Sequence, residues 1–136
     1  MKYIVCEEPG VIRVKDKAPP TISEGEALIR IERVGICGTD LHAYQGNQAF
    51  FTYPRILGHE LAGTVIEIEE NDQGLKVGDQ VAILPYLACN QCPSCNEGKT
   101  NCCERLQVLG VHVDGGMQQL ISIPIAYLIQ ANKLSL

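Results

Sequence analysis

Apolar and polar residues alternate along much of this chain in the pattern of β-strands that bury one face. Residues 27–34, Ala-Leu-Ile-Arg-Ile-Glu-Arg-Val, mix apolar and charged positions at roughly every second residue, and residues 61–68 are rich in Val, Ile and Thr. A shorter apolar run over residues 80–84 is closed by Pro85. We therefore expect strands in these three segments.

Two further apolar segments, 108–113 and 117–123, flank the triplet Asp114-Gly115-Gly116. Residues of this kind adopt the positive φ angles that tight turns need, so the triplet predicts a β-hairpin. Helical periodicity is weak, and we expect only short helices at 40–44 and around 100–105.

Many short strands separated by Gly and Pro turns are typical of small β-barrels. The chain has no internal repeat, low-complexity tract or linker. We therefore expect one mainly β domain over residues 1–136, built as a partly open β-barrel with short helices.

Composition narrows the class of protein. The chain has 136 residues, of which 46% are hydrophobic and 20% charged, and its mean hydropathy is +0.03. Such a chain buries a core without needing disulfides, and it is too polar for a membrane span and too apolar for disorder. Its formal net charge of −5 provides no basic surface for nucleic acid or an anionic membrane, so we expect neither as a partner.

The seven cysteines admit two interpretations, a secreted disulfide framework or a metal protein of a reducing compartment. The first residues, Met1 to Glu8, lack the apolar run of a signal peptide. Four of the cysteines also fall within the 15 residues from Cys89 to Cys103. We therefore expect a cytoplasmic metal-binding protein.

These four residues, Cys89, Cys92, Cys95 and Cys103, form the pattern Cys-x2-Cys-x2-Cys-x7-Cys. Zinc takes four thiolates at tetrahedral corners about 2.3 Å away, and closely spaced cysteines on one loop can supply them. The residues between them are mostly turn formers, as a wrapped loop requires. The pattern predicts a zinc-binding loop with a closed structural site; two local disulfides or free thiols are the alternatives, and Cys102 is a rival fourth ligand.

A second pair of metal-binding side chains comes from two separate segments. Cys37 follows the first predicted strand, and His59 precedes the next one. One thiolate and one imidazole delivered from two loop ends suit a catalytic zinc that keeps a position open. A single Cys and a single His in loops are, taken alone, more often core or surface residues.

No two glycines of the sequence are spaced as Gly-x-Gly. The fingerprint with which a Rossmann fold binds dinucleotide phosphates needs that spacing. We therefore expect no Rossmann domain in this chain, and any nicotinamide cofactor must be held mainly by protein outside it.

The motifs together resemble a known family. In order along the chain they are Gly35-Ile-Cys-Gly-Thr-Asp-Leu-His42, Gly58-His-Glu-x2-Gly63, Val77-Gly-Asp-Gln-Val81 and the cysteine quartet. Over nearly its whole length the chain is similar to the GroES-like catalytic domain of zinc-containing medium-chain dehydrogenases, closest to L-galactonate 5-dehydrogenase-like and sorbitol dehydrogenase-like members. One departure is Glu69, where the family pattern has Gly or Ala.

The resemblance implies a role for each of the matching residues. Cys37 and His59 correspond to catalytic zinc ligands, and Glu60 to an adjacent carboxylate that ligates directly or through water. Asp40 corresponds to a carboxylate that orients the ligand histidine. The family spacing of the quartet favours Cys103 over Cys102 as the fourth structural ligand.

The resemblance also implies a proton relay. Thr39 corresponds to the hydroxyl that receives the substrate proton, and His42 to the group that passes it to solvent. Thr39 acting only as a helix cap and His42 as a surface histidine are the alternatives. His112 either faces the pocket or supports its own turn.

On this basis the chain is expected to be the catalytic portion of a zinc-dependent NAD or NADP oxidoreductase for a secondary alcohol of a polyol or sugar acid, assembled as a homo-oligomer. The isolated chain should bind the structural zinc, hold the catalytic zinc weakly or not at all, and show no turnover. A zinc-stabilised binding module without catalysis is the alternative, and an oligomeric chaperonin cap is a third reading of the fold.

Overall fold

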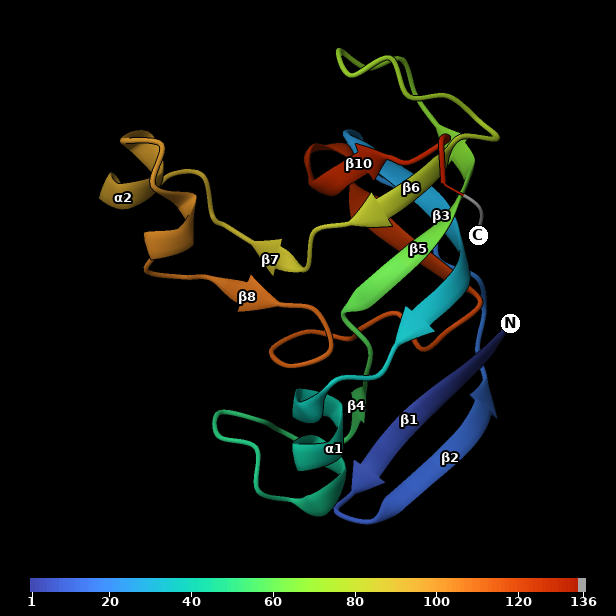
Figure 1. Cartoon of the computed structure of the whole chain (residues 1–136), viewed down its shortest axis with the longest axis vertical. Coiled ribbons are helices and arrows are strands. Elements are labelled where there is room, and N and C mark those ends of the chain that lie inside the picture. The colour runs from blue at the N-terminus through green and yellow to red at the C-terminus, as the bar shows by residue number, and fades with distance from the viewer. Residues whose placement is uncertain (135–136) are drawn as a thin grey trace.

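The computed structural model describes residues 1–134, which form three antiparallel sheets and a few short helices (Figure 1). The largest sheet has the strand order β10-β6-β5-β3-β9. Its strands are β3 (Glu26–Gly35), β5 (Glu60–Ile68), β6 (Gln80–Ile83), β9 (Leu120–Pro124) and β10 (Leu128–Gln130), and the short 3-10 helix η2 (Ile125–Tyr127) joins the last two. Strands predicted over 27–34, 61–68 and 80–84 are therefore confirmed.

The five-stranded sheet carries the main core on one face. Alternate residues of neighbouring strands are fully or almost fully buried, namely Ala27, Ile29, Val65, Val81 and Ile123. This arrangement follows from the twofold alternation of side chains along a strand. At Gly63 a side chain would collide with the backbone of Arg30, so only glycine lets β3 and β5 approach this closely.

A second sheet has the order β2-β1-β4 and consists of β1 (Lys2–Glu8), β2 (Val11–Asp16) and β4 (Arg55–Ile56). The helix α1 (Gly38–Gln45) lies beside it, and Cys6, Ala43 and Leu57 form a small core between them. The sequence did not predict β1 and β2. Every residue of β2 except Val11 is exposed, so its apolar residues do not mark a buried face.

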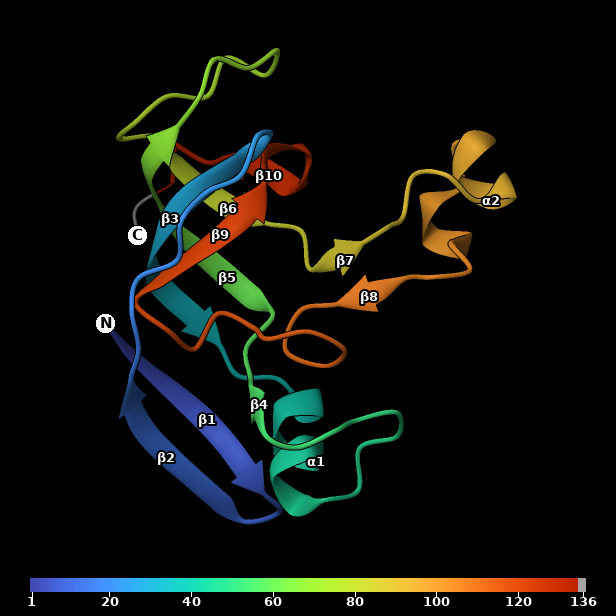
Figure 2. The same ribbon diagram turned by 180° about the vertical axis from the view of Figure 1, so that it is seen from behind.

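The cysteine-rich segment forms a lobe that projects away from the sheets, as two opposite views show (Figures 1 and 2). Two short paired strands connect it to the rest, β7 (Tyr86–Leu87) and β8 (Gln107–Val108). Beyond them lie α2 (Pro93–Asn96) and the 3-10 helix η1 (Thr100–Cys102). The helix predicted around 100–105 is thus a single 3-10 turn.

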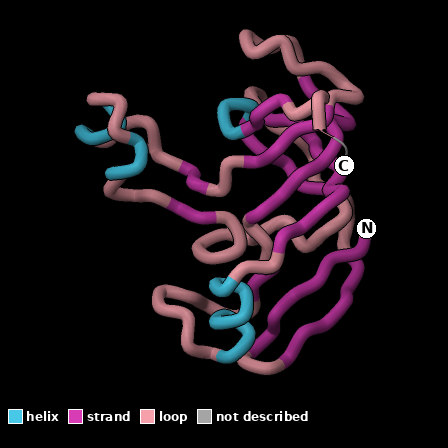
Figure 3. Tube along the Cα trace, in the orientation of Figure 1, coloured by secondary structure: helices cyan, strands magenta, loops and turns pink. Residues whose placement is uncertain are grey.

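The hairpin predicted around residues 114–116 is wrong. The strand before this triplet, β8, pairs with β7, and the strand after it, β9, pairs with β3. The intervening chain is largely a loop (Figure 3). Its glycines serve close packing instead of a turn, because the N–H groups of Gly115 and Gly116 donate to the carbonyls of Ile56 and Gly58 at 2.7 and 2.8 Å.

Helices are short throughout the structure. The helix predicted at 40–44 is confirmed as α1, which has 8 residues and ends at Gly46 in the left-handed conformation. In the described part of the chain, no helix has the length and apolar character that crossing a membrane requires.

Candidate metal centres

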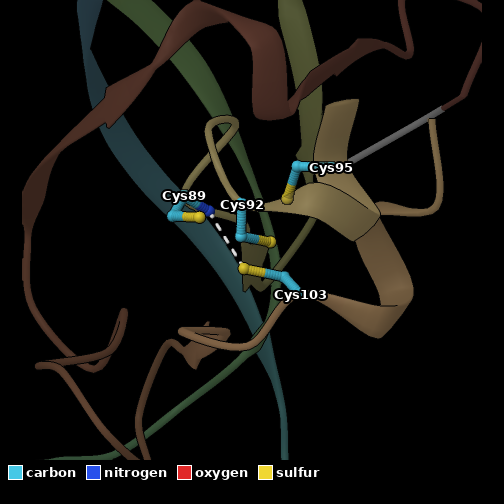
Figure 4. A group of neighbouring side chains, drawn as sticks. All are labelled: Cys89, Cys92, Cys95 and Cys103. Carbon is cyan, nitrogen blue, oxygen red and sulfur yellow. Dashed lines mark hydrogen bonds between the residues drawn. The ribbon is translucent and has the colours of Figure 1, made fainter. Parts of the chain in front are cut away.

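The four cysteines of the lobe point their sulfur atoms toward one centre (Figure 4). All four Sγ atoms lie within 4.8 Å of one another. Sulfurs held tetrahedrally about 2.3 Å from a zinc ion are about 3.8 Å apart, so the observed spread fits such an ion. The four sulfurs meet the geometric requirement for one shared metal.

Local backbone structure brings these sulfurs together. Asn90 and Gly98 both have positive φ angles, 56° and 77°, which reverse the chain between successive cysteines. Cys92 precedes the first turn of α2, where Pro93 fits because its missing N–H has no helical partner. The turn formers that the sequence shows between the cysteines thus have the function predicted for them.

Backbone N–H groups and burial set the acidity of these thiols. The N–H group of Gln91 lowers the pKa of Cys89 to about 6, and that of Glu104 lowers the pKa of Cys92. Burial instead raises the pKa of Cys95 to about 12. These three neighbouring thiols therefore differ in acidity, and a cation bound between them would favour their ionised forms.

Cys102 does not belong to this group. Its side chain is exposed, whereas that of Cys103 is 9% exposed and points inward. The N–H groups of Cys89 and Arg105 donate to the Cys103 sulfur at 3.3 and 3.4 Å. All seven cysteines are free thiols, so the described structure contains neither of the local disulfides considered as alternatives.

A second group of metal-binding side chains lies where the five-stranded sheet meets α1. Cys37 ends the connection from β3 and is the N-cap of α1, and its sulfur accepts the N–H of Thr39 at 3.3 Å. The Cys37 Sγ and His59 Nε2 atoms are 3.0 Å apart. The two ends of neighbouring strands β3 and β5 thus bring together side chains 22 positions apart.

Asp40 fixes both of these residues. Its carboxylate is 4% exposed and accepts the N–H of Cys37 at 3.0 Å and the N–H of Gly58, the residue before His59, at 3.2 Å. One Asp40 oxygen also lies 3.8 Å from the buried His59 Nδ1, which has no hydrogen-bond partner. Cys37, Asp40 and His59 form the second group of mutually close ligand atoms.

Glycine backbones hold His59 in place. Gly58 has a φ angle of 93°, which favours glycine over any residue with a side chain. A Cβ atom on Gly110 would lie 2.9 Å from the Gly58 nitrogen, and one on Gly115 would collide with the carbonyls of Leu57 and Gly58. Three stretches of backbone therefore pack together without intervening side chains directly beside the imidazole.

A pocket of about 280 Å³ opens beside His59. Its lining includes Thr39, Gln48, Phe50, His59, Tyr86 and His112. Three larger hollows, of about 370, 430 and 500 Å³, have no cysteine or histidine among the described residues that line them. The pocket of about 280 Å³ is therefore the one next to His59.

Two other predicted site residues, Glu60 and His42, lie outside the group formed by Cys37, Asp40 and His59. Glu60 is the first residue of β5, and its carboxylate lies over Gly35, outside the three mutually close residues. His42 is exposed, with its Nδ1 atom 3.0 Å from the Asn47 side-chain oxygen. The ligand role of Glu60 and the relay role of His42 stay predictions.

Sequence reasoning missed two features of the site. One is the capping box of α1, in which the Cys37 sulfur and the Asp40 carboxylate accept backbone N–H groups reciprocally. The Cys-x2-Asp spacing is its sequence signal. The other is the pocket wall formed by Gln48, Phe50 and Tyr86, which come from separate segments and have no common motif.

Comparison with known proteins identifies the family. Residues 23–133 match the alcohol dehydrogenase GroES-like domain. An L-galactonate-5-dehydrogenase of Escherichia coli K12 is 48% identical over 134 residues, which are 98% of this chain and 39% of that protein. An uncharacterized zinc-type alcohol dehydrogenase-like protein of Haemophilus influenzae is 50% identical over 126 residues, 91% of this chain and 36% of that protein.

A solved structure supports the same conclusion about the fold. The crystal structure of an Escherichia coli short chain alcohol dehydrogenase complexed with NADH has a TM-score of 0.85 and 37% identity, and the match covers 96% of this chain and 38% of that one. The chain thus spans about two fifths of the length of its relatives. The predicted mainly β, GroES-like fold is confirmed, and this chain belongs to the GroES-like domain family of the zinc-dependent medium-chain alcohol dehydrogenases.

Proposed function

We propose that this chain is the catalytic domain, over residues 1–136, of a zinc-dependent NAD or NADP oxidoreductase that acts on a secondary alcohol of a polyol or sugar acid. The observation that carries this proposal is the 3.0 Å approach of Cys37 Sγ and His59 Nε2 beside a pocket. The relative named L-galactonate-5-dehydrogenase supports the substrate class.

The side chains of both centres fit zinc. The lobe offers four converging thiols, a set that closes a structural site, with Cys89, Cys92, Cys95 and Cys103 as ligands. The second centre offers Cys37 and His59, with Glu60 as the proposed third ligand, directly or through water. The unpaired, buried His59 Nδ1 faces Asp40, as it would in a ligand histidine whose orientation a carboxylate fixes.

When bound, zinc would supply Lewis-acid polarisation of the alcohol oxygen, and a nicotinamide cofactor would supply the hydride acceptor. The chain's own residues would position and deprotonate the substrate. Thr39 lines the pocket, where its hydroxyl would take the substrate proton while passing its own onward. His42 would release that proton to solvent from its exposed position, and Phe50 and Val111 would exclude water from the pocket wall.

Partners and location follow as parts of the same proposal. The substrate is a small molecule, and the net charge of −5 gives no reason to expect nucleic acid or membrane binding. The free cysteines suit a cytoplasmic protein. We propose a homo-oligomer, with the nucleotide cofactor held mainly by protein outside this chain.

Zinc content and turnover test the proposal. After dialysis the purified chain is expected to retain about one zinc, the structural ion, and to take up a second only in excess metal. It should not oxidise polyols or sugar acids in the presence of NAD or NADP. Turnover by the chain alone would refute the predicted inactivity.

The catalytic assignment needs the chain joined to a nucleotide-binding half. In such a protein, Cys37→Ser and His59→Ala are expected to abolish turnover while leaving the lobe zinc in place. Full activity in either variant would refute the catalytic role of Cys37 and His59. No turnover in the joined wild-type protein would favour a zinc-stabilised binding module.

A further inference from the structure

We propose that His112 selects the substrate of the pocket, by presenting its Nε2–H group as a fixed hydrogen-bond donor to a second oxygen of the alcohol. That oxygen would be a hydroxyl or a carboxylate away from the reacting carbon. The inference rests on the proposed function and deepens it, because it names the group that distinguishes a polyol or sugar acid from a simple alcohol.

A contact with Val108 fixes which nitrogen of the His112 imidazole carries the proton. The Val108 N–H group donates to His112 Nδ1 at 3.0 Å. A backbone N–H can only donate, so Nδ1 must be the acceptor, and a neutral ring then carries its proton on Nε2. The loop contact therefore selects the tautomer that has its donor on the other side of the ring.

Backbone hydrogen bonds hold the loop that carries His112 in place. The backbone N–H of His112 donates to the Val108 carbonyl at 2.9 Å, and that of Gly110 donates to the Val113 carbonyl at 2.8 Å. Backbone and side chain of His112 are thus both tied to Val108. A donor held in this way loses little freedom when it binds a ligand.

His112 lines the same pocket as Thr39 and His59, which the proposed function places at the reacting oxygen. Much of the remaining wall is apolar, with Phe50 and Val111 among its residues. His112 is exposed, so a second oxygen of the substrate would replace water on the Nε2–H group, whereas a simple alkyl alcohol would make no hydrogen bond there.

A purely structural role for His112, support of its own loop, makes a different prediction, and two variants separate the roles. In His112→Asn the amide oxygen can take the place of Nδ1, so the loop contact is kept and the pocket donor is lost. In His112→Gln the amide nitrogen reaches the place of Nε2, so the donor is kept and the loop contact is lost.

The experiment uses the complete 136-residue chain loaded with zinc. NMR titrations measure binding of sodium gluconate, a six-carbon sugar acid, and of 2-butanol, an alcohol without a second oxygen. Imidazole nitrogen shifts of His112 report its tautomer. We expect an Nε2–H tautomer, an affinity for gluconate that falls about 10-fold in His112→Asn and less than about 3-fold in His112→Gln, and unchanged 2-butanol binding.

The possible results separate the two proposals. Loss of gluconate affinity in the Gln variant with retention in the Asn variant, or equal affinity in both, would overturn the role of His112 while leaving the proposed function intact. If the zinc-loaded wild-type chain binds neither probe, the pocket is not an alcohol site, and both proposals fail.

Discussion

The two candidate metal-binding groups of this chain are built in opposite ways. In the lobe, 15 consecutive residues supply all four sulfurs, and the elements around them are single turns. At the second centre, Cys37 and His59 come from the ends of two strands that pair along their whole length, and one buried carboxylate fixes both. The first group makes its own local structure, whereas the second depends on the sheet.

This difference predicts what each site needs. The lobe has little core of its own, so a bound ion has to supply the free energy that holds it together, as in other small metal-stabilised folds. The second centre is preformed by hydrogen bonds and glycine packing, so an ion there adds little to the stability of the fold. Metal binding is thus expected to stabilise the folded lobe strongly and the fold around the second centre only weakly.

Breaking the quartet should have the largest effect. Cys103→Ser is expected to remove the tightly bound zinc and to unfold the lobe, because structural zinc contributes on the order of 10 kcal/mol in small zinc domains. Elemental analysis and limited proteolysis between β7 and β8 measure the two effects. Cys37→Ser is the matched control, and a lobe equally sensitive to protease in that variant would contradict the separation of the two sites.

Removing the orienting carboxylate should affect only the second centre. Asp40→Ala is expected to weaken zinc binding there by about 10- to 100-fold, because the positions of Cys37 and His59 are no longer fixed. Competition with a chelator measures the affinity, and the lobe zinc of the same sample is the internal control. Equal loss of both ions would show instead that Asp40 supports the whole fold.

Acid is expected to lower the stability of the folded domain by protonating Asp79. This buried carboxylate accepts hydrogen bonds from Asn132, the Lys76 N–H and Gln130, and these bonds, with Asn132 first, hold its pKa below the ordinary 3.8. A carboxyl with a lowered pKa contributes stability that is present above pH 3.8 and lost as pH falls through the lower value.

Two melting experiments check this prediction. Asp79→Asn is expected to lower the melting temperature by roughly 5 °C at pH 7. The difference between variant and wild type should shrink below about pH 4, where the wild-type carboxyl also becomes protonated. A constant difference down to pH 2 would contradict the role given to the ionised carboxylate.

The smallest effect is expected at the exposed cysteine of the lobe. Cys102→Ser should leave the zinc content unchanged and the melting temperature within about 1 °C, since surface substitutions outside special sites have small effects. Loss of zinc in this variant would mean that Cys102, not Cys103, is the fourth ligand.

Local patterns predicted much of the fold and of the site. The strand β5 was predictable because its buried residues alternate with less buried ones. The strand β3 was predictable from the apolar and charged residues that alternate in its sequence, although Ala27, Leu28 and Ile29 are all buried. The approach of Cys37 to His59 was predicted mainly from the resemblance to a family, since residues 22 positions apart carry no local signal of contact.

The failures have physical reasons. Asp114-Gly115-Gly116 has the composition of a turn, but Gly115 is there to let backbones touch, a requirement set by residues far away in sequence. The strand β2 packs too little of its surface for its pattern to show a buried face. The pocket residues Phe50, Tyr86 and His112 meet only in the folded chain.

The glycine contacts beside the imidazole have a consequence for natural variation. Gly58, Gly110 and Gly115 have no functional group, yet any larger residue at Gly110 or Gly115 would push the segment that carries His59 out of place. Mutational tolerance at these positions should therefore be as low as at the ligands themselves. The position of His59 thus depends on the absence of side chains at Gly110 and Gly115.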